Sequence, residues 1–197
     1  FLTSYDLNRD GSLDLLVGVN DFPGGVDVYY GKGDGTFQAA TRLFLLNQNF
    51  YVQNIEVADL DRDDNLDVII MIGYSDPLDS KGAAAFTGGF FLLYGKPDGS
   101  FEEFVYQPGN GGDPGQGSAV DIDGDGILDL VSASGDTLDL SVVLGVGDRT
   151  FLPEQRFTMN RPGRAFGSGG ARFQVYDING DGAKDIAAVF GKLSYVE

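Results

Sequence analysis

The sequence predicts an all-β protein built from a repeated four-stranded unit, and three observations support this. An acidic nine-residue segment recurs four times, beginning at residues 6, 59, 121 and 177. Short and nearly continuously apolar runs follow each acidic segment. No stretch of the chain shows the apolar stripe of an amphipathic helix. The spacings of 53, 62 and 56 residues between the acidic segments are in the range of a β-propeller blade, so we expect antiparallel four-stranded blades.

Each unit is predicted to contain four strands, which the second unit illustrates. The first strand runs into the acidic segment (Ile55–Asp59), and the second leaves it (Leu66–Ile72). The third is another apolar run (Phe90–Tyr94), and the fourth is expected to begin at Phe101, after an Asp-Gly turn typical of hairpins. In the other units, the first strand is predicted at 173–177 and the second at 13–19, 128–133 and 185–190. The third strand is predicted at 26–30 and 140–144, and the fourth is expected to begin at Phe37 and Phe151.

The second strands are apolar at nearly every position, which is typical of strands covered on both faces. Periodicity alone does not exclude a buried helix, but the short length and the β-branched residues favour strands. The second unit is longer than the first and third by about 11 residues, and we expect this insertion between its second and third strands.

The acidic segments share the pattern D-x-[DN]-x-D-[GD]-x-x-D, which predicts a metal site. Side chains at positions 1, 3, 5 and 9 and the backbone carbonyl at position 7 would supply hard oxygen ligands, which favour Ca²⁺ over zinc or copper. Glycine at position 6 permits a sharp turn. The predicted ligands are Asp6, Asn8, Asp10, Ser12 and Asp14; Asp59, Asp61, Asp63, Asn65 and Asp67; Asp121, Asp123, Asp125, Ile127 and Asp129; and Asp177, Asn179, Asp181, Ala183 and Asp185.

Four solvated Asp-rich turns are the alternative interpretation, but four copies in one register favour metal binding. The second loop fits the pattern least well, because Asp64 stands where the other loops have glycine and adopts a left-handed conformation less readily. The predicted ligands include 14 of the 30 acidic residues, and four Ca²⁺ ions would reduce the formal net charge from −17 to −9. We therefore expect up to four calcium ions, one in each loop.

The composition argues against several classes of protein. Without His or Cys there is no Ser-His-Asp triad, thiol nucleophile or disulfide framework. A net charge of −17 argues against a nucleic-acid partner, and no apolar run is long enough to span a membrane. No nucleotide-binding or nucleophile-elbow motif is present, and carboxylates bound to Ca²⁺ are poor general acids. We therefore do not expect an enzyme.

The unit resembles the FG-GAP or VCBS repeat, which builds the calcium-binding β-propeller of integrin α-subunits. Residues 117–126 (GSAVDIDGDG) and 169–182 (GGARFQVYDINGDG) carry the resemblance, and Phe166-Gly167 stands where the family's Phe-Gly would precede a strand. The Gly-Ala-Pro part has no counterpart. The resemblance implies part of a seven-bladed propeller, with units at about 1–50, 51–109 and 110–163 and a half unit at 164–197. We expect a fragment of a longer chain, or closure through another copy.

Two functions remain open on the sequence. The first is an extracellular adhesion module that binds a protein or glycan through the loops opposite the calcium loops. The second is a building block of a surface or filament assembly, or the accessory propeller of a secreted enzyme. An extracellular setting is expected because such sites commonly need about 0.1–1 mM Ca²⁺. The irregular segments on the expected binding side are 20–25, 74–89, 109–117 and 160–170.

Overall fold

The computed structural model describes residues 1–21, 24–46, 50–74, 88–109, 114–135, 137–158 and 171–190. These residues form strands and loops without helices, which confirms the all-β prediction. The strands are β1 (Leu2–Tyr5), β2 (Asp14–Val19), β3 (Gly24–Tyr29), β4 (Thr41–Leu46), β5 (Phe50–Ala58), β6 (Asp67–Tyr74), β7 (Gly89–Leu93), β8 (Val105–Pro108), β9 (Pro114–Val120), β10 (Asp129–Ser134), β11 (Asp139–Val143), β12 (Gly145–Gly147), β13 (Thr150–Phe151), β14 (Gln155–Thr158), β15 (Ala171–Tyr176) and β16 (Asp185–Phe190).

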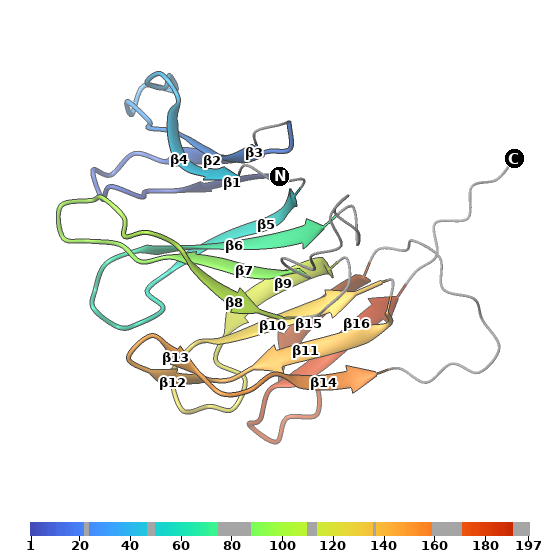
Figure 1. Cartoon of the computed structure of the whole chain (residues 1–197). Coiled ribbons are helices and arrows are strands. Elements are labelled where there is room, and N and C mark those ends of the chain that lie inside the picture. Colours follow the sequence, from blue (N-terminus) through green and yellow to red (C-terminus); the bar gives the residue numbers. More distant parts are fainter. Residues whose placement is uncertain are drawn as a thin grey trace, which may run out of the picture.

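Three four-stranded antiparallel sheets follow one another along the chain, as the repeat predicts. Their strand orders are β1-β2-β3-β4, β5-β6-β7-β8 and β9-β10-β11-β14, and below we name them sheets one, two and three. Strands β15 and β16 pair as a further hairpin, and β12 and β13 form a short separate ladder. The sheets lie one after another like the blades of a propeller (Figure 1).

The core lies between the sheets, in one cluster for each pair of neighbours. In β6, Ile70 and Ile72 face sheet one, whereas Ile69 and Met71 face sheet three, and all four are nearly inaccessible to solvent. In β7, Phe91 likewise faces sheet one, whereas Phe90 faces sheet three. A third cluster joins sheet three to the β15–β16 hairpin. Alternate residues of one strand thus pack against opposite neighbours, which explains the continuous apolar runs.

Polar side chains also connect the first strands of successive sheets. The Glu56 carboxylate on β5 accepts the N–H of Ala119 on β9 at 2.7 Å, and Asn54 donates its side-chain amide to the carbonyl of Gly117. The side-chain oxygen of Gln116 on β9 accepts the N–H of Phe173 on β15 at 2.8 Å. These bonds give each sheet polar contacts to the backbone of the next.

The predicted starts of the fourth strands at Phe37, Phe101 and Phe151 were wrong. Each Phe instead bridges the glycine just after the third strand, and the next residue donates its N–H to the carbonyl before that glycine. Strands β4, β8 and β14 begin four residues later. Residues 38–40, 102–104 and 152–154 lie between this local pairing and the fourth strands, and they are exposed.

Several predicted features lie wholly or partly outside the described residues. These are the insertion and the segments expected on the binding side, of which 22–23, 75–87, 110–113 and 159–170 are not described. The bounds of β6 and β7 do place residues 75–88 between the second and third strands of sheet two. In the described part of the chain, no helix has the length and hydrophobicity needed to cross a membrane.

The packing between sheets two and three generates a test. Phe90 is 1% exposed and belongs to the cluster that joins these sheets. We expect Phe90→Ala to lower the free energy of unfolding by about 3–5 kcal/mol, because it removes buried apolar area and leaves a cavity. Chemical denaturation measures this. Phe157→Ala is the control, since Phe157 is 53% exposed, and equal losses in the two variants would contradict the assigned core.

Candidate metal centres

The four acidic loops join the first strand of a unit to its second, and backbone hydrogen bonds to their own side chains shape them. In the second loop, Asp59 at position 1 accepts the N–H groups of Asp63 and Asp64. Asp61 at position 3 accepts the same N–H of Asp63, and Asp63 at position 5 accepts the N–H of Asn65 at 2.8 Å. The first and last loops repeat this arrangement at the matching positions. The third loop differs in one bond, since Asp121 accepts the N–H of Gly124 in place of that of Asp125.

Two positions of each loop are left-handed. Position 6 has a φ of 88° at Gly11 and 66° at Asp64, so the aspartate adopts the conformation for which the other loops use glycine. Position 4 is also left-handed and is occupied by arginine or glycine, for example Arg62 with a φ of 64°. The sequence pattern indicated a left-handed residue only at position 6. The second loop thus closes with the same backbone as the others despite Asp64.

The aspartate at position 9 begins the second strand and ties three strands together. Asp67 accepts the N–H of Leu60 at 2.7 Å through one oxygen and the N–H of Gly95 at 2.8 Å through the other. Gly95 follows β7, so this carboxylate links the acidic loop to the second hairpin of the same sheet. The matching bonds in sheets one and three are made by Asp14 and Asp129. In the last hairpin, Asp185 accepts the N–H of Ile178.

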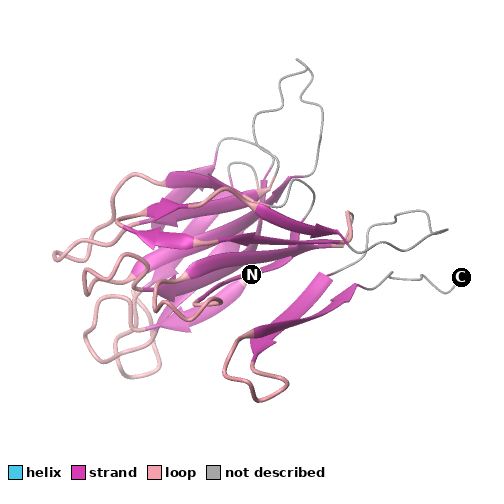
Figure 2. Ribbon diagram, turned by 90° about the horizontal axis from the view of Figure 1, so that it is seen from below, coloured by secondary structure: helices cyan, strands magenta, loops and turns pink. Residues whose placement is uncertain are grey.

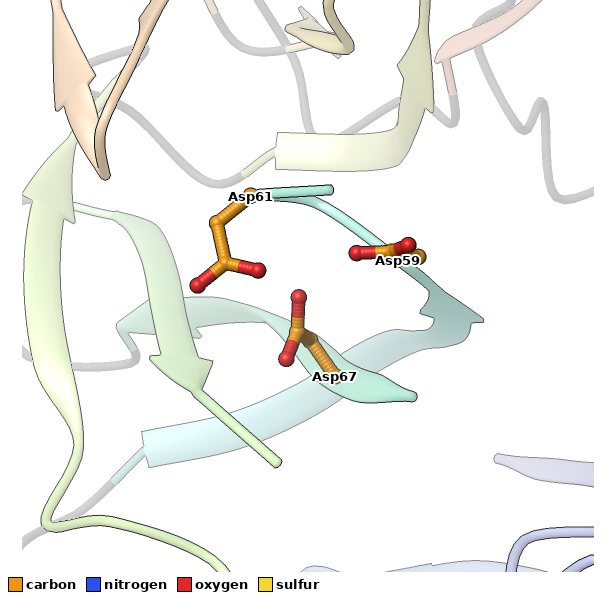
Figure 3. A group of neighbouring side chains, drawn as sticks. All are labelled: Asp59, Asp61 and Asp67. Atoms are coloured by element: carbon orange, nitrogen blue, oxygen red, sulfur yellow. The ribbon is translucent and has the colours of Figure 1, made fainter. Parts of the chain in front are cut away.

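Carboxylates converge in two of the four loops. Asp59, Asp61 and Asp67 each offer an oxygen, and these oxygens lie within 4.8 Å of one another. Figure 3 shows the three side chains of this group directed toward a common space. Asp121, Asp123 and Asp129 form the equivalent group in the third loop. These residues are the predicted ligands of positions 1, 3 and 9.

The remaining predicted ligands are placed differently. The position 5 carboxylates, Asp63 and Asp125, are not in the two groups and lie beside them as acceptors of the position 7 N–H. In the first and last loops, asparagine replaces the carboxylate at position 3. Asn8 donates its side-chain amide to Asp10 at 3.0 Å, and Asn179 does the same to Asp181. The position 7 residues Ser12, Asn65, Ile127 and Ala183 donate their N–H groups to position 5, and such bonds leave their carbonyls available to a metal.

Burial and hydrogen bonding move the pKa values of the loop carboxylates in opposite directions. Burial raises the pKa of Asp67 to about 6, since the side chain is 1% exposed, and the nearby charges of Asp61 and Asp63 add to the effect. Burial also raises the pKa of Asp129. The pKa of Asp10 falls because it accepts the N–H of Ser12. A buried carboxylate with a raised pKa is destabilised as an anion, and a cation at the site would relieve this.

Sequence reasoning missed two sets of residues around these loops. The glycines after the third strands (Gly31, Gly95 and Gly145) have no room for a Cβ, which would overlap the backbone carbonyl of Leu13, Leu66 or Leu128. The recurring Tyr-Gly and Leu-Gly pairs were the available signal. Arg149 was also missed, although it bonds Asp61 at 2.5 Å from the neighbouring sheet. The only sign of this contact in the sequence is that an arginine stands where the equivalent turns of the first two units have glycine.

The donor set suits a hard divalent cation. Both groups consist of carboxylate oxygens, and the chain has no His or Cys that would favour a softer metal. Ca²⁺ is accommodated by six to eight oxygen ligands in flexible geometry, which an irregular loop with mixed side-chain and backbone oxygens can supply. The residues present therefore fit a calcium ion.

An all-β repeat of four-stranded sheets with an Asp-rich loop between the first two strands defines the class of this protein. Residues 6–70 and 121–188 match the family model of the FG-GAP-like repeat, and the chain belongs to this family. No curated protein matches the chain. The family match covers all four acidic loops.

The glycine contact in sheet two can be tested by adding one methyl group. We expect Gly95→Ala to lower the free energy of unfolding by about 1–3 kcal/mol, because the methyl group would overlap the Leu66 carbonyl and displace the N–H that Asp67 accepts. Thermal or denaturant unfolding measures the change. Gly99→Ala is the control in the same hairpin, since its Cβ would meet nothing within 4 Å and only its left-handed φ of 79° is strained. A smaller loss at Gly95 than at Gly99 would contradict the close contact.

The raised pKa of Asp67 predicts a pH dependence of the metal-free protein. Its folded-state pKa of about 6 exceeds the ordinary value of 3.8, so the folded state binds this proton more tightly than the unfolded chain does. The contribution of Asp67 to stability is therefore largest at low pH and is lost as the pH rises through 6.

In chelator, the stability difference between wild type and Asp67→Asn should grow by about 1 kcal/mol in favour of wild type from pH 7 to pH 5. Denaturant unfolding at each pH gives this difference. The variant loses an acceptor for a buried N–H at every pH, so the change in the difference is the informative quantity. A difference that stays constant with pH would show that Asp67 titrates at its ordinary pKa.

Proposed function

We propose that the chain is a calcium-stabilised, non-catalytic binding module of an extracellular protein. The observation that carries the calcium part is the convergence of three carboxylates, one of them fully buried, at the same positions in the second and third loops. Calcium would bind at up to four loops, with the first and last using asparagine at position 3. Each ion would fix the hairpin that joins the first two strands of a sheet.

The position of the metal loops supports a division of roles between the two ends of the strands. The acidic loops lie at the same end as the turns between the third and fourth strands, because Gly31, Gly95 and Gly145 bond the position 9 aspartates. In Figure 2 the described loops gather mainly on one side of the sheets. The opposite end carries connections of unequal length, residues 20–23 between β2 and β3 but 75–88 between β6 and β7. Variable loops on a rigid scaffold are common binding surfaces.

The proposed ligand is a protein or a glycan, bound at the end of the strands opposite the calcium loops. Membership of the FG-GAP-like family and the rigid, metal-bearing end support a display function. The extracellular setting rests on calcium affinity, since exposed loops of this kind commonly bind in the range of about 0.1–1 mM. A protein and glycan array probed in calcium and in chelator would test this part, and the absence of any discrete ligand would contradict it.

The calcium proposal predicts a metal-specific gain in stability. Thermal unfolding should shift upward in Ca²⁺ and not in an equal concentration of Mg²⁺, because Mg²⁺ requires a more regular octahedral shell. At 100 times its Kd, an ion bound only to the folded state adds about 2.7 kcal/mol for each independent site. Calorimetric titration gives the number of sites.

The variant Asp123→Ala removes a carboxylate from the third-loop group and should lower the number of sites by one. Asp34→Ala is its matched control, because Asp34 lies in an exposed turn where it accepts the N–H of Thr36. No calcium-specific shift, or an equal effect of the two variants, would exclude the loops as calcium sites.

A further inference from the structure

Arg149 occupies an unusual backbone position in the turn between β12 and β13. Its φ is 63°, and the preceding Asp148 is also left-handed at 49°. The equivalent turns of sheets one and two have glycine at this position, Gly35 with a φ of 85° and Gly99 with a φ of 79°. An arginine held in a conformation that favours glycine is strained, and such strain persists only where other contacts stabilise it.

The contacts that hold Arg149 come from the neighbouring sheet, and they reach the second acidic loop. Its guanidinium donates to Asp61 at 2.5 Å and to Glu102 at 2.9 Å, and lies 3.8 Å from Asp63. It also stacks over the Tyr94 ring, 4.3 Å from the centroid. An arginine guanidinium stays protonated in proteins. A fixed positive charge therefore lies against two predicted calcium ligands.

The first and third loops show the surroundings of an acidic loop to which, in the described part of the chain, no counterpart of Arg149 is bonded. Beside the first loop, where the adjacent turn carries Gly99, a hollow of about 230 Å³ lies between Asn8, Arg9 and Lys96. The third loop has the same four aspartates as the second, at positions 1, 3, 5 and 9. Among the described residues, no arginine or lysine bonds Asp123, the counterpart of Asp61. The second and third loops therefore carry the same aspartates but differ in whether an arginine bonds the position 3 carboxylate. The guanidinium of Arg62 lies beside the backbone of Gly126 in the third loop, and within the described ranges it makes no bond to the aspartates there.

We propose that Arg149 is a built-in counter-cation of the second loop, which competes with Ca²⁺ for Asp61 and Asp63 and weakens calcium binding there. This inference rests on the proposed calcium function. One oxygen of Asp61 accepts the N–H of Asp63 and the other accepts Arg149, so a calcium ion must share or displace the arginine. A unit charge about 5 Å from a divalent ion weakens its binding roughly tenfold even at the dielectric constant of water.

Two metal states of the second loop follow from this arrangement. At low calcium, Arg149 offsets part of the negative charge of the second loop and bonds the β12–β13 turn to the residues beside sheet two. At high calcium, the ion takes the Asp61 oxygen and the guanidinium keeps only Glu102 and Tyr94 as partners. The third loop then fills at a lower calcium concentration than the second.

The test is calorimetric titration of Ca²⁺ into the full chain and into Arg149→Met. Methionine keeps an unbranched stem and the strained φ, but it lacks the guanidinium group and its charge. We expect affinity at one site to rise about tenfold or more, and the metal-free variant to unfold at a lower temperature because the bonds to Asp61 and Glu102 are lost. Arg156→Met is the charge-matched control, since Arg156 pairs with Asp139 and Glu154 in sheet three and should change no site.

Loop-specific variants assign the change. The gain from Arg149→Met should persist in an Asp123→Ala background, which lacks the third site, and disappear in an Asp59→Ala background, which lacks the second. Circular dichroism in chelator verifies that each variant is folded, and Arg149→Gly, the residue of the sister turns, repeats the test without backbone strain.

Unchanged binding at the second loop in both Arg149 variants would overturn the inference by showing that the arginine does not compete with the ion. Weaker binding would overturn it by showing that Arg149 orients Asp61 for the ion. That result is distinct from a failure of the calcium proposal, which would appear as no binding at the third loop in the wild-type chain.

Discussion

The position 9 aspartate is the constraint on which each sheet depends. One buried carboxylate receives an N–H from the acidic loop and another from the glycine after the third strand, so the first, second and third strands meet at one side chain. An anion in such a place is expensive to bury, and hydrogen bonds alone leave the pKa of Asp67 raised. A nearby positive charge would lower this cost, and the surrounding carboxylates of Asp59 and Asp61 lie where such a charge would act.

The features that the sequence predicted correctly are those set by local spacing. Nine-residue acidic segments at matching intervals fixed the number of units, and runs such as Val68–Ile72 indicated strands with two covered faces. Both inferences needed only residues close together in the chain. The convergence of the carboxylates at positions 1, 3 and 9 in the second and third loops has the same origin, because a tightly curled loop brings side chains at fixed spacing together.

The features that sequence reasoning missed depend on contacts between distant segments. Arg149 and Asp61 are 88 residues apart, and nothing in either segment alone shows that the turn of one sheet lies over the loop of the previous one. The starts of the fourth strands were misplaced because Phe37, Phe101 and Phe151 have strand-forming side chains but belong to separate short pairings, an isolated bridge for Phe37 and Phe101 and the β12–β13 ladder for Phe151. The close contact at Gly95 was likewise visible only once Leu66 was placed beside it.

The bonds from Asn54 and Glu56 to the backbone of β9, and from Gln116 to β15, make recognition between sheets directional. These bonds depend on the main chain of the following unit, and they add to the apolar side-chain packing that joins the same neighbours. Stability then approximates a sum of unit terms and nearest-neighbour terms, as in a one-dimensional lattice. Duplicating a whole unit adds one unit term and one interface, so an array of this kind can lengthen during evolution with little adjustment of the units already present.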